Sequence, residues 1–420
     1  MQKTLDYYLL NLATGVRIGI TLPHQSVQST FADLPGYFNV SISEDLTKFW
    51  RTASGSMANN MASAVMGAIG EAMERYSAAV VDFPIKKAIE IENLKEKIIT
   101  AKEFSLFSRA QHEDVSLGLK STEDKDAYYG EVYSLYDNSK AWVPQEMIGL
   151  GARKEPALIA STSTGLAAHT NKYRAILLAL QEVLERDALA TTWLNSLGGR
   201  EIKLDEKYTQ PIQEKYGQVY CLDMTQDWNP HPVVAVCGYI PQRNKKRISM
   251  GVACRETYAK AIEKAYTEWM QGTIFAGLYD VYHPDLELKK TEDVGGFDEH
   301  AVYYTVYPSK WNKVPLLEKR VPHIPEAQED HSSDVKENIA NLLKELSKQN
   351  IRIYYRDISL PDVKEAGLTV VRVLSPEMSL LHGDERRPFL GGRTADVAWR
   401  YRNIKRTNEK FPNPYPHPLG

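Results

Sequence analysis

Residues 175–186 read AILLALQEVLER, and the same pattern occurs at residues 64–75 (AVMGAIGEAMER) and at residues 261–272 (AIEKAYTEWMQG). Each copy begins with Ala, repeats Ala one helical turn later, and then carries a Glu followed by a second Glu or a Gln. The copies lie too far apart for the short period of a solenoid. The repeat therefore predicts three similar helices that present their acidic side chains within one pseudo-symmetric core.

The first two copies pair carboxylates on one helical face, Glu71 with Glu74 and Glu182 with Glu185, because residues three apart project together. A solvated acidic face is one explanation for such pairs. Their flanks are almost wholly apolar, however, which favours buried helices whose carboxylates need counter-charges. Mg²⁺ held together with substrate phosphates would provide them, whereas a di-iron centre would need a His after a Glu that neither copy has.

An Arg ends each of these two copies, Arg75 in one and Arg186 in the other. The planar guanidinium suits phosphate recognition. The sequence has neither a Walker GxxxxGK[ST] motif nor a GxGxxG motif. Any nucleotide would therefore be held by an unusual fold.

The composition is that of a soluble globular protein. The chain has 420 residues, of which 43% are hydrophobic and 25% charged, and 51 Lys and Arg against 54 Asp and Glu give a net charge of −3. This balance provides no global field for nucleic acid or for a membrane surface. No apolar stretch approaches the ~20 residues of a membrane span, and the opening residues lack a signal-peptide pattern. We expect a cytoplasmic protein that binds neither nucleic acid nor membrane.

Only three cysteines occur, Cys221, Cys237 and Cys254. They form no CxxC motif and stand in apolar, strand-like stretches. This arrangement argues against a disulfide framework or a zinc site that uses them, and it favours buried small side chains.

Short strand-like runs alternate with helical patterns along the whole chain, without a low-complexity linker. Strands are predicted at 218–222, 233–239, 247–253, 301–306, 351–355 and 368–374. A helix is predicted to begin after Ser333 or Asp334, where apolar residues recur at helical spacing. Residues 117–126, 283–300 and 322–332 are predicted to be surface loops. We expect one α+β domain over residues 1–420, with mixed sheets flanked by helices.

Three further segments carry groups that could bind a ligand or take part in a reaction. The hydroxyl-rich turn 161–165 (STSTG) would either cap a helix or bind phosphate. Arg372 lies inside an apolar strand, where an Arg more often pairs structurally than binds a ligand, and residues 388–393 read PFLGGR. The tail 412–420 (PNPYPHPLG) alternates prolines, so it is either a disordered terminus or a stiff rod suited to a groove.

Together these segments resemble the YcaO family, and specifically its azoline-forming peptide cyclodehydratases. The resemblance rests on GEAMER (70–75), on residues 161–188, on the third helix with Glu268 and Gln271, on PFLGGR and on the proline-rich tail. It implies an ATP-binding YcaO-type fold that acts on a ribosomally made precursor peptide. In that family a Cys, Ser or Thr side chain attacks the preceding amide, and ATP phosphorylates the amide-derived oxygen, giving an azoline, ADP and Pi.

The resemblance also implies roles for individual residues. Glu71, Glu74, Glu182 and Glu185 would be Mg²⁺ ligands, and Glu71 and Glu182 would also line the ATP site. The remaining ATP-binding residues would be Arg186, Gln181, Arg75 and Arg372. The tail 412–420 would enter the active site, with Pro416 and Pro418 positioning Gly420, whose carboxylate would act as a base.

The sequence departs from the family pattern in three places, one of which is near Arg174, where an acidic residue is common. Family members often carry SGKG before the first helix, where this chain has Ser54, Gly55, Ser56 and Met57, so a phosphate-side lysine is missing. Gly67 stands where a Ser is common. The missing lysine keeps open a non-catalytic scaffold that binds nucleotide or peptide, and a thioamide- or amidine-forming enzyme is a further alternative.

We recognise no extra leader-binding domain before the first motif. The resemblance therefore implies that a separate E1-like, leader-binding subunit presents the precursor peptide, within a homodimer or a hetero-oligomer. An FMN-dependent dehydrogenase that oxidises the rings is a further possible partner.

Overall fold

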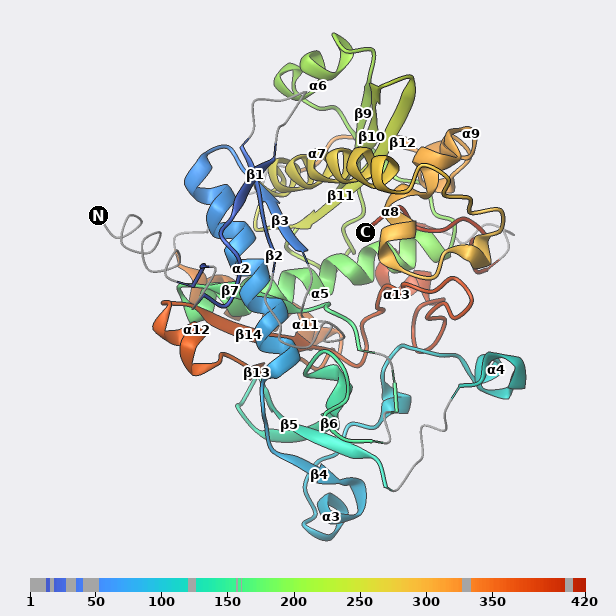
Figure 1. Cartoon of the computed structure of the whole chain (residues 1–420). Coiled ribbons are helices and arrows are strands. Elements are labelled where there is room, and N and C mark those ends of the chain that lie inside the picture. The colour runs from blue at the N-terminus through green and yellow to red at the C-terminus, as the bar shows by residue number, and fades with distance from the viewer. Residues whose placement is uncertain are drawn as a thin grey trace.

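The computed structural model describes residues 13–15, 19–27, 35–40, 53–119, 126–155, 158–159, 161–326, 334–404 and 411–420. Its three long helices are the three repeat segments, and they lie in the middle of the molecule (Figure 1). They are α2 (Met61–Val80), α5 (Lys172–Leu194) and α7 (Tyr258–Tyr282). The shorter helices are α3 (Ala88–Asn93), α4 (Arg109–Glu113), α6 (Glu206–Gln213), α8 (Phe297–Val306), α9 (Pro308–Trp311), α10 (Pro315–Glu318), α11 (Val335–Lys348), α12 (Pro361–Glu365) and α13 (Val397–Arg400).

The described strands form three sheets around these helices. The first has the order β1-β2-β3, from β1 (Gln25–Val27), β2 (Gly36–Val40) and β3 (Ala53–Met57). The second has the order β11-β10-β9-β8-β12, from β8 (Arg200–Ile202), β9 (Gln218–Asp223), β10 (Val233–Gln242), β11 (Lys245–Cys254) and β12 (Val321–His323). The third has the order β4-β5-β13-β14-β7, with β6 on β5, from β4 (Ile85–Lys87), β5 (Tyr128–Ser134), β6 (Lys140–Pro144), β7 (Leu166–His169), β13 (Tyr354–Asp357) and β14 (Thr369–Leu374). Neighbouring strands are antiparallel, except that β12 runs parallel to β8.

Each long helix begins at a side chain that caps it. Asn60 accepts a hydrogen bond from Ser63 N at the start of α2. Asn171 accepts from two backbone N–H groups at the start of α5, and Thr257 accepts from Lys260 N at the start of α7. These caps satisfy N–H groups that a helix cannot pair internally. They fix where each helix starts and therefore which turn carries the acidic side chains.

Each long helix is also the centre of its own hydrophobic cluster. The cluster around α5 includes Ala179, Leu180 and Val183, and the cluster around α2 includes Ile69 and Met73. The cluster around α7 is built on side chains such as Ala265, Trp269 and Met270. Three cores around three related helices confirm the predicted pseudo-symmetric arrangement.

Most of the predicted elements are confirmed. The helix after Asp334 is α11, with the Asp334 side chain as its N-cap. The runs at 218–222, 233–239, 247–253 and 368–374 are strands, and the run at 351–355 becomes a strand only from residue 354 onward. All three cysteines are buried and free. Among the described helices, none combines the length and the apolar content needed to cross a lipid bilayer.

The strand predicted at 301–306 is wrong, because these residues form the second half of α8, which begins inside the predicted loop 283–300. The segment AVYYTV is rich in side chains that favour strands, and five of its six residues are buried. Periodicity cannot separate a strand from a helix when nearly every side chain is buried. Packing against α5 and β11 decides the outcome, for example through Tyr304, which lies edge-on to Trp193.

Candidate functional site

The acidic side chains of the three long helices converge on a single site. In α2 and α5, the first Glu of the pair accepts a hydrogen bond from the backbone next to its own helix. Gly55 N of β3 donates to Glu71 Oε2 at 2.9 Å, and Gly165 N, just before β7, donates to Glu182 Oε2 at 3.2 Å. These two carboxylates are thus fixed in direction by the sheet on which their helix packs.

Each long helix and the strand before it form one unit: β3 with α2, β7 with α5, and β11 with α7. The second Glu in α2 and in α5 bonds to the strand of the next unit along the chain. Ala168 N of β7 donates to Glu74 Oε1 at 2.7 Å. Cys254 N of β11 donates to Glu185 Oε2 at 3.1 Å. The helix of the first unit is therefore tied to the second unit, and the helix of the second unit to the third.

Gln271 of α7 closes this ring. Its Nε2 donates to the carbonyl oxygen of Gly55 at 3.1 Å, so the helix of the third unit is tied to the strand of the first. A carbonyl oxygen can only accept a hydrogen bond, and an amide can donate whereas a carboxylate cannot. This explains why the third copy of the repeat has Gln where the other two have Glu.

Burial and mutual repulsion disfavour the charged forms of these acids. The pKa of Glu74 is raised to about 8, chiefly because its carboxylate loses hydration and then because of the nearby charge of Glu182. The pKa of Glu185 is also raised to about 8, again by burial first, with Glu268 contributing. Burial likewise raises the pKa of Glu71. Acids from all three helices therefore influence one another's protonation, and a cation placed among them would favour their charged forms.

Basic side chains lie among the acids. Arg186 contacts two carboxylates, Glu182 at 3.2 Å and Glu185 at 3.5 Å. Arg75 lies 3.7 Å from Glu71 on the same helix. Because Arg186 divides its charge between two acids, neither receives a full counter-charge.

Arg372 of β14 points into the same region. It is 1% exposed, its Nη1 donates to Thr162 O at 2.8 Å, and its Nε has no hydrogen-bond partner. Burial lowers its pKa to about 10, and the charge of Glu182 opposes that change. A buried guanidinium with a free donor is suited to an anion such as phosphate. The hydroxyl-rich turn 161–165 thus links Arg372 to Glu182, through Thr162 and Gly165.

Gln181 is placed differently from the other predicted site residues. It is fully buried, its Nε2 lies 3.2 Å from His231 Nδ1, and its Oε1 has no partner. Next to it, Arg174 pairs with Glu256. Gln181 therefore belongs to a polar group beside the carboxylates, and its unpaired oxygen is available to a ligand.

The tail 412–420 is ordered against the protein rather than extended into solvent. Tyr304 Oη donates to Pro416 O at 2.7 Å, Pro418 is buried, and Leu419 belongs to the core around α5. Gly420 packs on α8, where an added Cβ would lie 2.6 Å from that of Ala301.

The buried end of the tail also lies within electrostatic reach of Arg186. Burial holds the pKa of His417 well below its ordinary value, and the charge of Arg186 adds to that effect.

Two residues near the site, Lys264 and Arg255, were missed as site residues by sequence reasoning. Lys264 lies 3.1 Å from Glu268 and its charge lowers the pKa of Glu71, opposing the dominant effect of burial. Arg255 acts in the same direction on Glu185. Lys264 could have been found as the i,i+4 partner of Glu268. Arg255 gave no such signal, because its position depends on the turn after β11.

Gly67 and Ser56 account for the departure from the family pattern on α2. An added Cβ on Gly67 would lie 2.2 Å from the Oγ of Ser56. A Ser at position 67 would need this space. The hydroxyl group is therefore supplied by the neighbouring strand instead of by the helix.

The residues fit a magnesium-bound nucleotide. Hard cations such as Mg²⁺ take oxygen ligands, and carboxylates commonly share the ion with substrate phosphates. The site offers carboxylates with raised pKa values together with guanidinium groups for the phosphates. The ligands come from helices and strands whose positions are fixed by packing, as a positioned phosphate site requires.

The chain was compared with known proteins. The family model described as YcaO cyclodehydratase, ATP- and Mg²⁺-binding, matches residues 56–379. No curated protein sequence matches.

Solved structures show the same fold. A heterocyclase in complex with substrate and cofactor has a TM-score of 0.75 and 20% identity over 99% of this chain, which spans 57% of that protein. The YcaO protein from Methanopyrus kandleri bound with AMPPCP and Mg²⁺ has a TM-score of 0.65 and 15% identity, covering 92% of both chains. A chain of the E. coli microcin synthetase McbBCD complex has a TM-score of 0.61 and 17% identity, covering 87% of this chain and 90% of that one.

The family model covers most of the chain, including all three long helices, and one structural match covers 99% of it. The expected mixed α/β fold with helices flanking several sheets is confirmed. The chain belongs to the YcaO family, whose members bind ATP and Mg²⁺.

Proposed function

We propose that this protein is an ATP-dependent peptide cyclodehydratase that converts Cys, Ser or Thr residues of a precursor peptide into azolines. The observation that carries the proposal is the closed ring of acidic side chains with Arg186 and Arg372 beside it. Phosphoryl transfer depends mostly on positioning and charge neutralisation, and these residues provide both.

In the proposed reaction, a peptide hydroxyl or thiol adds to the preceding amide carbon. The amide oxygen then takes the γ-phosphoryl group of ATP and leaves as phosphate, so each ring removes the elements of one water from the peptide and yields ADP and Pi. Glu71, Glu74, Glu182 and Glu185 would hold Mg²⁺, and Arg75, Arg186, Arg372 and Gln181 would contact ATP. No protein nucleophile is needed.

The tail supports the azoline-forming version of this reaction. Its last residues are fastened to α8, with His417 in electrostatic reach of Arg186. We propose that Pro416 and Pro418 position the Gly420 carboxylate, which accepts the proton released during ring formation. A preset tail of this kind loses little conformational freedom when substrate binds.

We further propose that an E1-like, leader-binding subunit presents the peptide. The chain spans 57% of the heterocyclase and 90% of the matching chain of the McbBCD complex. The match to a chain of a multi-subunit complex supports this proposal. An FMN-dependent dehydrogenase that oxidises the rings would be a later, separate partner.

The test is release of phosphate from Mg-ATP, with mass spectrometry of a Cys- and Ser-containing precursor peptide, in the presence of the partner subunit. We expect each ring to remove the mass of one water and to accompany one ADP and one Pi. Glu182→Gln should abolish both readouts, and Glu206→Gln, an exposed acid on α6, should change neither. Nucleotide binding without any turnover would indicate a scaffold instead.

The role of the tail needs a smaller change than removal of its last five residues. Leu419 is part of a hydrophobic core and Pro416 accepts a buried hydrogen bond, so a five-residue truncation would also destabilise the fold. Deleting Gly420 alone withdraws the carboxylate by one residue. We expect ring formation to fall while nucleotide binding is kept. An equal loss of both would show that the tail is only structural.

A further inference from the structure

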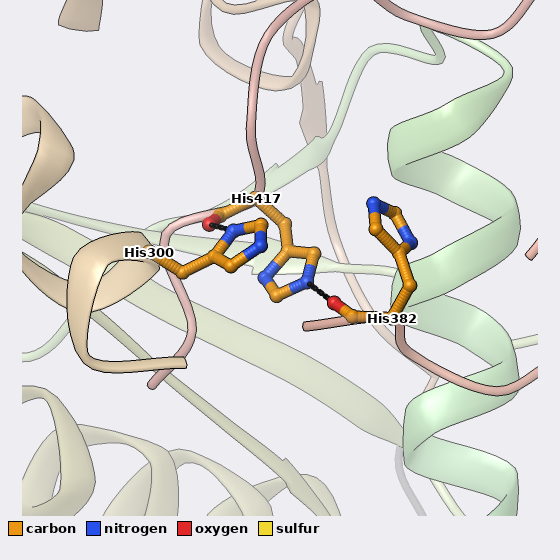
Figure 2. A group of neighbouring side chains, drawn as sticks. All are labelled: His300, His382 and His417. Atoms are coloured by element: carbon orange, nitrogen blue, oxygen red, sulfur yellow. Dashed lines mark hydrogen bonds between the residues drawn. The ribbon is translucent and has the colours of Figure 1, made fainter. Parts of the chain in front are cut away.

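Three histidines meet where the tail passes between α8 and the loop after β14 (Figure 2). They are His300 of α8, His382 of the loop and His417 of the tail, and each is at most 2% exposed. One ligand atom from each lies within 4.8 Å of the other two. In the part of the chain that the structure describes, this is the one such group of three His, Cys or acidic side chains.

The hydrogen bonds of two of these rings determine where their protons are. His300 Nδ1 lies 2.8 Å from the carbonyl oxygen of His417, and His417 Nε2 lies 2.8 Å from the carbonyl oxygen of His382. A carbonyl oxygen only accepts, so both of these nitrogens carry a proton. The lone pairs are left on His300 Nε2 and His417 Nδ1, and neither has a hydrogen-bond partner.

The third ring, His382, pairs with a carboxylate. His382 Nδ1 has no partner, and its Nε2 lies 3.3 Å from Glu385 Oε1. The same carboxylate oxygen lies 3.7 Å from His300 Nε2. Unpaired nitrogens of buried polar side chains are rare and call for a ligand.

We propose that His300, His382 and His417 form a site for a first-row transition-metal ion such as Zn²⁺. Neutral imidazole is a common zinc ligand, and metal-bound His usually donates its other ring nitrogen to a carbonyl or carboxylate, as His300 and His417 do here. Three His ligands would leave the fourth position of a tetrahedral zinc site to water, and Glu385 would hold the Nε2–H of His382.

The ion would draw the rings together. Nitrogens in a tetrahedral zinc site lie about 3.3 Å apart, which is closer than the 4.8 Å limit that this group satisfies. The rings of His300 and His417 are stacked at 3.8 Å with an angle of 8° between them, so one ring must turn to aim its lone pair at a shared ion. We expect this turn to accompany metal binding.

This site is chemically distinct from the carboxylate ring. Mg²⁺ prefers oxygen ligands and binds imidazole poorly, whereas Zn²⁺ accepts both. The zinc site would join the tail to α8 and to the loop after β14. Its ligand in the tail, His417, is only three residues before Gly420. Its role would be to hold the end of the chain in place, whatever reaction the carboxylate ring supports.

The first experiment measures the metal content of the full-length protein produced in zinc-supplemented medium and purified without chelator. We expect about one zinc ion per chain for the natural sequence and less than about a tenth of that for His417→Ala. His283→Ala, an exposed His at the end of α7, is the matched control and should keep its zinc. If His417→Ala does not fold, His382→Gln serves in its place.

A second measurement separates this site from the proposed function. Glu182→Gln should lose ATP turnover and keep its zinc, and stripping zinc with a chelator should lower the Tm of the natural protein but not that of His417→Ala. A natural protein without zinc would overturn the proposal and leave the three rings as a hydrogen-bonded latch. Equal zinc content in His417→Ala would also overturn it.

Discussion

Helix α5 carries two buried acids two positions apart that have opposite surroundings. Asp187 is fully buried and faces Arg400, which is fully buried as well, with Nη2 at 2.6 Å and Nε at 2.8 Å. Ser379 N and the side chain of Gln226 complete its hydrogen bonds, at 2.7 and 3.1 Å. Every lone pair that Asp187 presents has a partner, so this acid is structural.

Glu185 is also buried but is compensated only in part. It accepts one backbone hydrogen bond and shares Arg186 with Glu182, and its pKa is raised to about 8, chiefly by burial. The contrast with Asp187 teaches how to separate buried acids. One with a complete set of partners supports the fold, and one that lacks full compensation is placed for a cation.

The largest effect expected from this contrast is on folding, at the structural acid. Arg400→Leu leaves Asp187 charged, buried and unpaired, so we expect the free energy of unfolding to fall by about 3–5 kcal/mol. Denaturant titration followed by tryptophan fluorescence measures it. Arg402→Leu, exposed and two residues away, is the control. A loss below about 1 kcal/mol would mean that the pair is not structural.

Glu185→Gln tests the other acid. We expect Mg-dependent ATP turnover to fall at least about 100-fold, because the change removes a charge from the site of phosphoryl transfer. The free energy of unfolding should stay the same or rise, since a neutral amide tolerates this buried position and Cys254 N can still bond to the amide oxygen. Steady-state phosphate release and denaturant titration together decide the matter. A large loss of stability would show that Glu185, like Asp187, is a structural acid.

Ligand-induced stabilisation sharpens the comparison further. With Mg²⁺ and AMPPCP at about 100 times the Kd, the natural protein should gain about 2.7 kcal/mol of stability. Glu182→Gln should gain far less at the same concentrations, and AMPPCP without Mg²⁺ should stabilise neither protein as strongly. Differential scanning fluorimetry measures the shifts in Tm. Equal shifts in both proteins would remove Glu182 from the site.

The smallest effect is expected at Gln271. Gln271→Ala removes one hydrogen bond to Gly55 O, which should cost about 1 kcal/mol. Gln271→Glu should cost more, because it replaces the donor by a carboxylate close to Glu268 and Glu71. Denaturant titration of both variants checks this order. The reverse order would show that α7, like α2 and α5, tolerates a carboxylate at the second acidic position of the repeat.

The sequence revealed the site better than it revealed the network around it. The shared pattern of three helices predicts Glu71, Glu74, Glu182 and Glu185 as neighbours, because helical spacing is local. The pair Asp187–Arg400 joins residues far apart in the chain, and no local sequence pattern predicts it. For the same reason the convergence of three histidines from α8, a loop and the tail was not predicted.

The ring of hydrogen bonds has a consequence for the order in which the protein matures during synthesis. When the ribosome has completed α5, Glu185 still lacks Cys254 N, and the carbonyl of Gly55 waits for Gln271. The ring can therefore close only after residue 271 has been translated, and Arg372 joins the same region later still.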